Sequence, residues 1–250
     1  MTSLALAPAH ELLPVPPAGR RYVGHATVRL GDADRRGEAR LDAVARYLQD
    51  VANDDALDAG LDNAMGWVVR RTLIGQDQPA RLGERLTATT FCSGTGRSWA
   101  ERRTSIVGDA GASIEAVSLW VQVDPTSGRP TRLGDGFHRI YGEAGGGRVV
   151  SSRLALGPPP DGAEIRPWPV RISDLDVFGH ANNAAQWAVL EEAMAGVRGR
   201  RGTAEIEYPG AVDAGAVIEA HLVSGEQTAA WLVERGVVRC ASRWMPAAVG

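Results

Sequence analysis

Apolar residues recur at steps of three or four positions in two stretches of the chain. The first stretch carries Leu41, Val44, Ala45, Leu48, Val51 and Ala52, and the second carries Ala184, Trp187, Leu190, Met194 and Val197. This spacing places the apolar side chains of each stretch on one face of an amphipathic helix. The sequence therefore predicts one helix from Leu41 to about Ala56 and a second that continues to Val197.

Segments typical of β-strands surround both predicted helices. In residues 113–123, for example, valine and leucine alternate with serine, tryptophan and glutamine, as in a half-buried strand. The predicted strands are residues 22–30, 67–74, 85–92, 97–107 and 113–123, then 203–208, 216–223, 228–235 and 237–244. A long helix followed by antiparallel strands, occurring twice, predicts an α+β protein in which each sheet wraps its own helix.

The two halves also share a sequence motif. Residues 28–39 align without a gap on residues 170–181, with Val, Arg, two Asp, Gly and Ala in common. Two copies are too few for a solenoid and instead indicate a pseudo-dimer on one chain. The copies differ at Glu38, which stands where the second copy has His180, and at Arg40-Leu41, which stand where it has two asparagines. We therefore expect one working site, in the second unit.

Composition and charge narrow the class of protein. The chain has 250 residues, of which 44% are hydrophobic, and a net charge of −3, which argues against general nucleic-acid binding. Two isolated cysteines favour a reducing cytoplasm, and no apolar run has the length of a membrane span. The N-terminus carries Glu11 and several prolines, which does not favour a signal peptide. We expect a leader at 1–20, an N-terminal domain at 21–140, a Gly/Pro-rich linker at 141–162 and a C-terminal domain at 163–250.

Chemistry-bearing residues gather where the second helix is expected to begin. Asp176, Gly179, His180, Asn182 and Asn183 lie within eight positions of one another. A helix start offers unpaired N–H groups and the positive end of a dipole, so a carboxylate and an imidazole there could polarise a carbonyl and activate water. Each residue alone also has a structural interpretation, as a helix cap for Asp and Asn or as a buried core histidine.

Other catalytic arrangements are less well supported by the sequence. No grouping of His, Cys and Asp has metal-ligand spacing, so we expect no metal site. Cys92 and Cys240 have no histidine beside them to form a thiolate, and no Gly-x-Ser-x-Gly motif provides a serine nucleophile.

The Asp176–Asn183 stretch resembles the Asp…His-Val-Asn-Asn segment of the acyl-acyl-carrier-protein (acyl-ACP) thioesterases, plant-type enzymes of the hotdog superfamily. Residues 48–50, 67–69, 83–84 and 120–121 are similar to that family's N-terminal domain in order and spacing. The resemblance implies a tandem double hotdog in fatty acid biosynthesis, acting without a cofactor on fatty acyl thioesters of acyl carrier protein. It implies catalytic roles for Asp176 and His180, with Gly179, Asn182, Asn183 and Trp67 binding substrate.

Several alternatives stay open from the sequence. The substrate could be acyl-CoA, and the same fold also serves dehydratases and non-catalytic acyl-thioester binding proteins. Asp176 could act as a general base or as a nucleophile, and the chain could form a homodimer. Two positions depart from the family: Phe178 stands where the plant enzymes have Asn, and Ala211-Val212 where they have an acid and a cysteine. Arginine groups at 70–71, 97–103 and 198–201 are candidate docking surfaces for the acidic carrier protein.

Overall fold

The computed structural model describes residues 12–61, 66–197, 199–225 and 227–247. Its strands are β1 (Tyr22–Thr27), β2 (Gly66–Gln78), β3 (Arg85–Thr95), β4 (Trp99–Gly108), β5 (Ser113–Val123), β6 (Glu164–Trp168), β7 (Gly202–Glu207), β8 (Ile218–Val223), β9 (Thr228–Glu234) and β10 (Val237–Pro246). Its helices are α1 (Leu41–Asp58), α2 (Asp135–Tyr141) and α3 (Ala188–Ala193), with 3-10 turns η1 (Leu30–Asp32), η2 (Ile172–Asp174) and η3 (Ala185–Trp187).

The strands form one antiparallel ten-stranded sheet in the order β1-β3-β4-β5-β2-β7-β10-β9-β8-β6. β2 of the first half pairs with β7 of the second, from Arg71 opposite Glu207 to Gln76 opposite Gly202. This pairing joins two half-sheets, each formed by one unit of the sequence repeat. The α+β prediction and the two-unit plan are confirmed.

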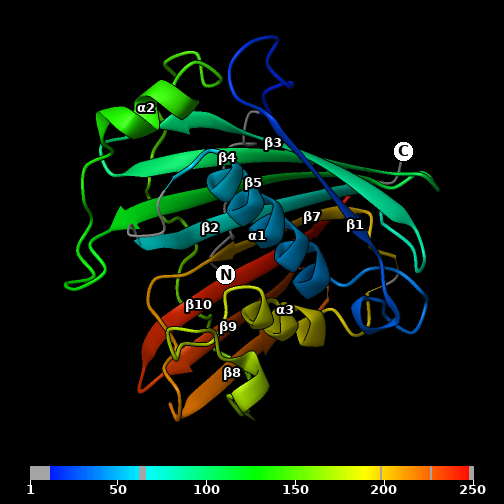
Figure 1. Cartoon of the computed structure of the whole chain (residues 1–250). Coiled ribbons are helices and arrows are strands. Elements are labelled where there is room, and N and C mark those ends of the chain that lie inside the picture. The colour runs from blue at the N-terminus through cyan, green and yellow to red at the C-terminus, as the bar shows by residue number, and fades with distance from the viewer. Residues whose placement is uncertain (1–11, 62–65, 198, 226, 248–250) are drawn as a thin grey trace.

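Both central helices pack on the same side of this sheet (Figure 1). α1 crosses the first half-sheet and buries the predicted apolar stripe, including Leu41, Val44 and Leu48. A further position on this face is Asp55, which is also buried. The η3–α3 segment packs on the second half-sheet through Trp187 and Leu190, and both halves share one continuous core cluster.

The second helix is shorter than predicted. The chain is a 3-10 turn over η3, α-helical only over α3, and leaves the helix at Met194, so the prediction of a helix reaching Val197 is wrong. Its apolar positions are nevertheless buried, because Trp187, Leu190 and Met194 face the sheet core. Gly196 and Gly199 follow, and the chain turns back so that Arg200 reaches Glu191 on α3.

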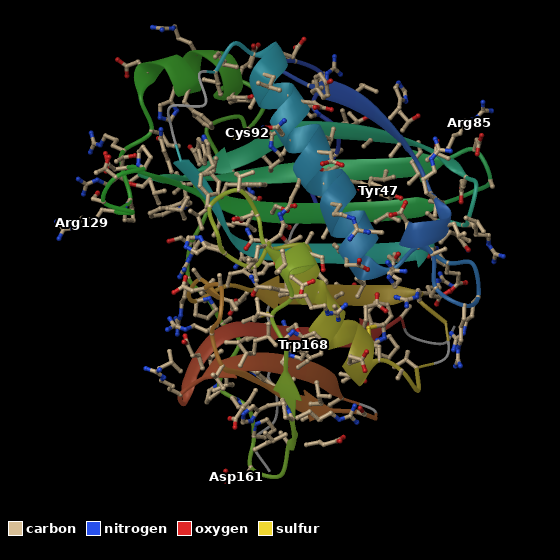
Figure 2. All side chains as sticks on the ribbon, turned by 60° about the horizontal axis from the view of Figure 1, so that its bottom comes forward. Tyr47, Arg85, Cys92, Arg129, Asp161 and Trp168 are labelled. Atoms are coloured by element: carbon tan, nitrogen blue, oxygen red, sulfur yellow. The ribbon has the colours of Figure 1, made fainter. Side chains whose placement is uncertain are left out.

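Helix α2 is absent from the predicted elements. It lies between the last strand of the first unit and the Gly/Pro-rich connection to β6, whose tip near Asp161 projects from the molecule in Figure 2. Phe137 and Tyr141 of α2 pack with Leu133, Cys92 and Trp67 in a second core cluster. A short helix next to the Gly/Pro-rich segment thus covers one end of the first half-sheet.

Candidate active site

The predicted site lies in a tight turn between η2 and η3. One carboxylate oxygen of Asp176 accepts hydrogen bonds from the backbone N–H of Phe178 at 2.9 Å and of His180 at 3.3 Å. The backbone N–H of Asp176 donates to the carbonyl of His180 at 2.8 Å, which closes the turn. Gly179 has φ +80°, a conformation that residues with a Cβ rarely adopt. These bonds hold the Asp176 carboxylate in a fixed position and leave its second oxygen available.

Asp176 borders a cavity of about 540 Å³ that lies between the two units. The second unit contributes Asp176, Val177, Phe178, Asn182 and Asn183. The first unit contributes Gln49, Ala52, Asn53, Ala56 and Leu61 from α1 and its C-terminal end, Gly66, Trp67, Cys92, Ala100, Glu101, Arg102 and Trp120 from the sheet, Pro125, and Phe137 and Tyr141 from α2. A turn from one unit therefore faces a chamber built by the other.

Aromatic side chains form much of the chamber wall. The ring centroids of Trp67 and Phe137 are 5.5 Å apart, and those of Phe137 and Tyr141 are 4.9 Å apart. Cys92 lies beside α1, on the side of the molecule that carries α2 (Figure 2). Burial raises the pKa of its thiol, so this cysteine stays protonated and is a poor nucleophile. The wall suits an apolar chain, while Asp176 at the turn supplies the reactive group.

Four of the six predicted site residues line this cavity: Asp176, Asn182, Asn183 and Trp67. The side-chain oxygen of Asn182 accepts the backbone N–H of Ala184 at 2.8 Å, which directs its amide nitrogen away from that bond. The backbone carbonyl of Asn183 accepts a hydrogen bond from the hydroxyl of Tyr208 at 2.9 Å. Within the described residues no hydrogen bond engages the side-chain nitrogen of either asparagine, so both nitrogens can donate to a ligand.

Gly179 and His180 lie outside the cavity lining. The His180 ring is 46% exposed, and its Nε2 is 3.4 Å from the Asp213 carboxylate. The contact of His180 with Asp176 runs through its backbone N–H. The histidine therefore stands at the back of the turn, beside a carboxylate from the loop before β8.

Sequence reasoning did not place Asp213, Phe137 or Tyr141 at the site, and it gave Arg102 only as a candidate docking residue for the carrier protein. Asp213 follows directly after Ala211-Val212, the positions where the family acid was sought, and the bridge between His180 and Asp213 is what brings the two together. Only the pairing of distant segments reveals this contact, so the local sequence carries no signal for it.

The first unit contains the same turn. One oxygen of Asp34 accepts the backbone N–H of Arg36 at 2.8 Å and of Glu38 at 3.1 Å. Its other oxygen is 3.2 Å from the Arg200 guanidinium, which also forms two bonds to Glu191 at 2.7 and 2.5 Å. The position equivalent to the Asp176 site is therefore filled by internal ion pairs.

Contacts of this kind lower the pKa of two carboxylates in the first unit, Asp34 and Asp32. Burial by itself raises the pKa of Asp34, but backbone hydrogen bonds from Glu38 and Arg36 and the contact with Arg200 together lower it below its ordinary value. The pKa of Asp32 is lowered in the same way, against the effect of burial, by the backbone N–H of Arg29 and the side chains of Tyr47 and Arg46. Both carboxylates stay ionised and serve as structural anchors.

The predicted arginine docking surfaces are largely used inside the molecule. Arg71, Arg102, Arg103 and Arg200 are buried or nearly so, and Arg200 and Arg102 form ion pairs. Arg201 pairs with Asp77 at the surface. The expectation of a free basic patch is therefore wrong for Arg71, Arg102, Arg103 and Arg200, whereas Arg97 is exposed and Arg198 lies outside the described residues.

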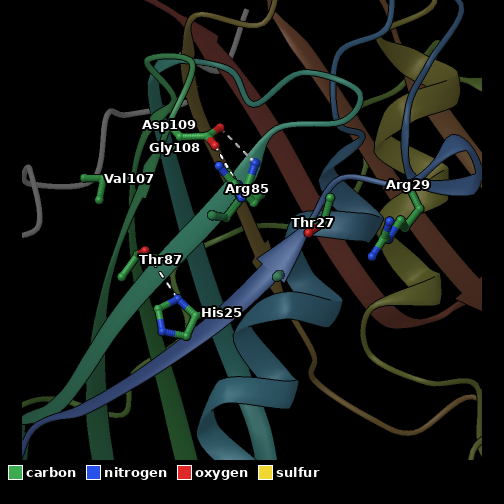
Figure 3. Close-up of a pocket in the computed structure, with 10 residues that line it drawn as sticks. His25, Thr27, Arg29, Arg85, Thr87, Val107, Gly108 and Asp109 are labelled. Carbon is green, nitrogen blue, oxygen red and sulfur yellow. Dashed lines mark hydrogen bonds and ion pairs between the residues drawn. The ribbon is translucent and has the colours of Figure 1, made fainter.

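A second hollow, of about 620 Å³, lies at the outer edge of the sheet. Figure 3 shows the residues of β1, β3 and the end of β4 that line it, among them His25 and Thr87, and the pair of Arg85 with Asp109, whose atoms are 2.9 Å apart. It contains no residue of the Asp176 turn. The described part of the chain holds no cluster of three His, Cys, Asp or Glu side chains arranged for a metal, and none of its helices could cross a membrane.

Comparison with known proteins identifies relatives along most of the chain. Residues 19–141 match the acyl-ACP thioesterase N-terminal domain, and residues 159–235 match the acyl-ACP thioesterase C-terminal domain. An uncharacterized protein of Mycobacterium tuberculosis is 32% identical over 181 residues, which cover 72% of this chain and 72% of that protein.

Solved structures share the fold at low sequence identity. The 12:0-ACP thioesterase from Umbellularia californica has a TM-score of 0.74 at 17% identity, covering 90% of this chain and 96% of its own. An acyl-ACP thioesterase from Bacteroides thetaiotaomicron has a TM-score of 0.73 at 16% identity, covering 90% of this chain and 97% of its own. These likenesses confirm the predicted tandem double hotdog.

Proposed function

The chain belongs to the acyl-ACP thioesterase family, whose two domain models match it in order, and from this we propose a mechanism and a set of site residues. The enzyme hydrolyses fatty acyl thioesters of acyl carrier protein to the free fatty acid and the holo-carrier. One observation carries the assignment of the site: Asp176, fixed by two backbone hydrogen bonds, borders the cavity between the units.

In this proposal the acyl chain lies against Trp67 and Phe137, and the thioester carbonyl lies beside Asp176. The side-chain N–H of Asn182 donates to the thioester carbonyl oxygen as negative charge develops there. The hydrogen bond from the Ala184 N–H to the side-chain oxygen of Asn182 orients this amide in advance. Asp176 either removes a proton from the attacking water or attacks the carbonyl carbon itself. The thiol leaving group has a pKa of about 8.5, so its departure needs little acid assistance.

His180 is a positioning residue in this proposal. Its backbone N–H binds the Asp176 carboxylate, and its ring is held by Asp213 behind the turn. In the first unit, Arg200 contacts Asp34 and is itself bonded to Glu191, so this turn is closed to substrate. The first unit therefore supplies only the chamber wall. Each chain would therefore contain one site.

Release of free thiol from acyl-carrier-protein and acyl-CoA thioesters of matched chain length tests the proposal. We expect release with the carrier-protein substrates and its loss in Asp176→Asn. Comparable kcat/KM for the two carriers would make the protein a general acyl thioesterase. Tight binding of acyl thioesters without thiol release would identify a binding protein. In a single turnover in isotopically labelled water, label in the carboxylate of the Asp176 peptide identifies a nucleophile, because water activated by a general base places its oxygen in the fatty acid only.

A further inference from the structure

The cavity opens to solvent at one end of the sheet. Val177, Phe178 and Pro125 line the cavity, although Val177 is 94% and Phe178 is 77% exposed. Pro125 lies just beyond the end of β5, where Val123 pairs with Gly66 at the start of β2. A substrate with its acyl chain in the cavity therefore places its carrier at this end of the sheet.

Exposed arginine side chains gather on the segments that flank this opening. We call them the mouth arginines: Arg97 from the turn between β3 and β4, Arg129 and Arg132 from the loop between β5 and α2, and Arg139 from α2. The backbone N–H of Leu133 in this loop donates to the carbonyl of Arg97 at 3.0 Å, which joins the loop to the turn. Figure 2 shows Arg129 projecting outward. The mouth arginines thus lie close to the cavity without belonging to its lining.

The mouth arginines have no partners among the described residues. No hydrogen bond or ion pair engages their side chains there, whereas Arg102 and Arg200 are bonded to carboxylates inside the protein. Two aspartates accompany them in residues 124–139, and one of these, Asp124, accepts the hydroxyl and the backbone N–H of Ser127 within its own loop. The opening therefore carries an excess of positive charge on the side of α2.

The opposite sign of charge appears along α1. This helix lines the cavity through Asn53 and Ala56, and its neighbouring side chains Asp50 and Asp54 are exposed. The opening is thus positive beside α2 and negative along α1. An acidic partner is attracted to the first side and repelled by the second, so the two sides together favour one direction of approach.

Exposed apolar side chains complete this surface. Val177 and Phe178 stand at the same opening as the mouth arginines. Apolar side chains that are bordered by charged groups are typical of a protein–protein interface, in which a polar rim surrounds an apolar centre. A basic surface that met only water would not account for two such side chains beside the site.

We propose that the mouth arginines and the apolar pair Val177 and Phe178 form the docking surface for acyl carrier protein, which approaches from the side of α2. This inference rests on the proposed function and specifies how its partner is recognised. The carrier is acidic, so the arginines steer its approach and pair with its surface carboxylates. Its prosthetic arm then enters the opening and brings the thioester to Asp176.

The test reverses charge at one end of the sheet or at the other. Arg129→Glu/Arg132→Glu changes the mouth arginines, and Arg35→Glu/Arg81→Glu is the matched control with the same change in net charge. Arg35 and Arg81 are also exposed and have no side-chain partner among the described residues. Arg81 follows the far end of β2, a strand of 13 residues or about 40 Å. Melting temperatures close to that of the wild type check that both double variants fold.

Three decanoyl thioesters separate the possible roles of the arginines: those of acyl carrier protein, of phosphopantetheine and of pantetheine. At low ionic strength we expect Arg129→Glu/Arg132→Glu to raise KM for the carrier substrate by about tenfold, with kcat within about twofold. Hydrolysis of decanoyl pantetheine should be unchanged, and the control variant should keep the wild-type KM. Added salt should reduce the difference, because it screens exposed charges.

Three results would overturn the docking surface while the thioesterase function stands. A similar rise in KM in both double variants would mean that only the total charge of the protein matters. An equal rise with decanoyl phosphopantetheine would assign the arginines to the phosphate of the arm. An unchanged KM for the carrier substrate would remove the arginines from its recognition.

Binding of fluorescently labelled holo-carrier, followed by anisotropy, is independent of turnover. Arg129→Glu/Arg132→Glu should weaken this binding by about tenfold, and the control variant should match the wild type. If the wild type hydrolyses no thioester, the proposed function fails, and this measurement alone decides the inference. Wild-type binding to vesicles of anionic lipid but not to the carrier would overturn it in favour of a membrane surface.

Discussion

Asp34 and Asp176 occupy equivalent turns in the two halves of the chain but face different surroundings. Each binds two backbone N–H groups of its own turn through one oxygen. The second oxygen of Asp34 meets Arg200, whereas Asp176 borders the interunit cavity. The repeat therefore supplies an internal control for any experiment on the site.

The first prediction uses this control. Asp176→Asn should lower kcat by about 100-fold or more, because an amide neither removes a proton nor attacks a carbonyl. The amide oxygen can still accept the two N–H bonds, so the turn should be kept and the melting temperature should change little. Asp34→Asn should leave kcat within a fewfold. Similar losses of kcat in the two variants would contradict the assignment of a single site.

Arg200 should contribute strongly to stability. It joins Asp34 to Glu191, and Glu191 in turn accepts the backbone N–H of Leu41 at the start of α1. Arg200→Met should lower the free energy of unfolding by about 2–3 kcal/mol, since two partly buried carboxylates lose their partner. Urea denaturation measures this change.

The neighbouring Arg201→Met provides a matched control. Arg201 pairs with Asp77 at the surface, where both side chains are well exposed. Its loss should change the free energy of unfolding by less than about 0.5 kcal/mol. Equal effects from the two substitutions would show that the internal pairs are not what stabilises the first turn.

Acid should remove the contribution of Asp34. Because its pKa is lower in the folded state than in the unfolded chain, the stabilisation is complete above the unfolded value of about 3.9 and is lost as pH falls through the folded value. The stability difference between the wild type and Asp34→Asn should therefore be constant from about pH 7 to 5 and shrink below about pH 4. Denaturation at a series of pH values measures it, and a difference that already falls near pH 6 would argue against the ionised pair.

Much of the fold could be predicted from local pattern, and the site only in part. The apolar stripe of α1 and the alternation of β5 are regular and long, so the first half follows the sequence closely. The repeat in the sequence is enough to locate the two equivalent turns. α2 could not be found this way, because seven residues between Gly134 and Gly142 carry too few periods, and its burial depends on contacts with β2 and β3.

Side-chain partners from distant segments were beyond the sequence. Asp213 meets His180, and Arg200 meets Asp34 across 166 positions. Neither contact follows from spacing, since both depend on how the two half-sheets join. The early end of α3 also goes with a contact from outside the helix, because the chain turns back after Met194 and Arg200 then meets Glu191.

The pair of His180 and Asp213 predicts a coupled effect. His180→Ala keeps the backbone N–H that binds Asp176, so kcat/KM should fall by about tenfold or less. Asp213→Asn should give a similar loss, and the double variant should lose no more than either alone, since both changes remove one contact. Asp77→Asn, at an exposed ion pair elsewhere, is the control. Additive losses would mean that the two side chains act separately.

The aromatic wall should determine how binding grows with acyl chain length. Trp67 from the first unit and Phe178 from the second both line the cavity, and Phe178 is 77% exposed. Each methylene buried against such a surface contributes about 0.8 kcal/mol, so log kcat/KM should rise steadily with chain length in the wild type.

Trp67→Leu and Phe178→Asn should flatten this rise, with losses of about tenfold for long chains and little change for short ones. Phe178→Asn also introduces the residue that the plant enzymes have at this position. An increase in kcat with short chains would therefore show that an amide here contributes to the reaction. Val68→Ala, next to Trp67 and exposed at the surface, is the control. A uniform loss at all chain lengths would place the acyl chain away from these rings, because only contacts with the chain itself scale with its length.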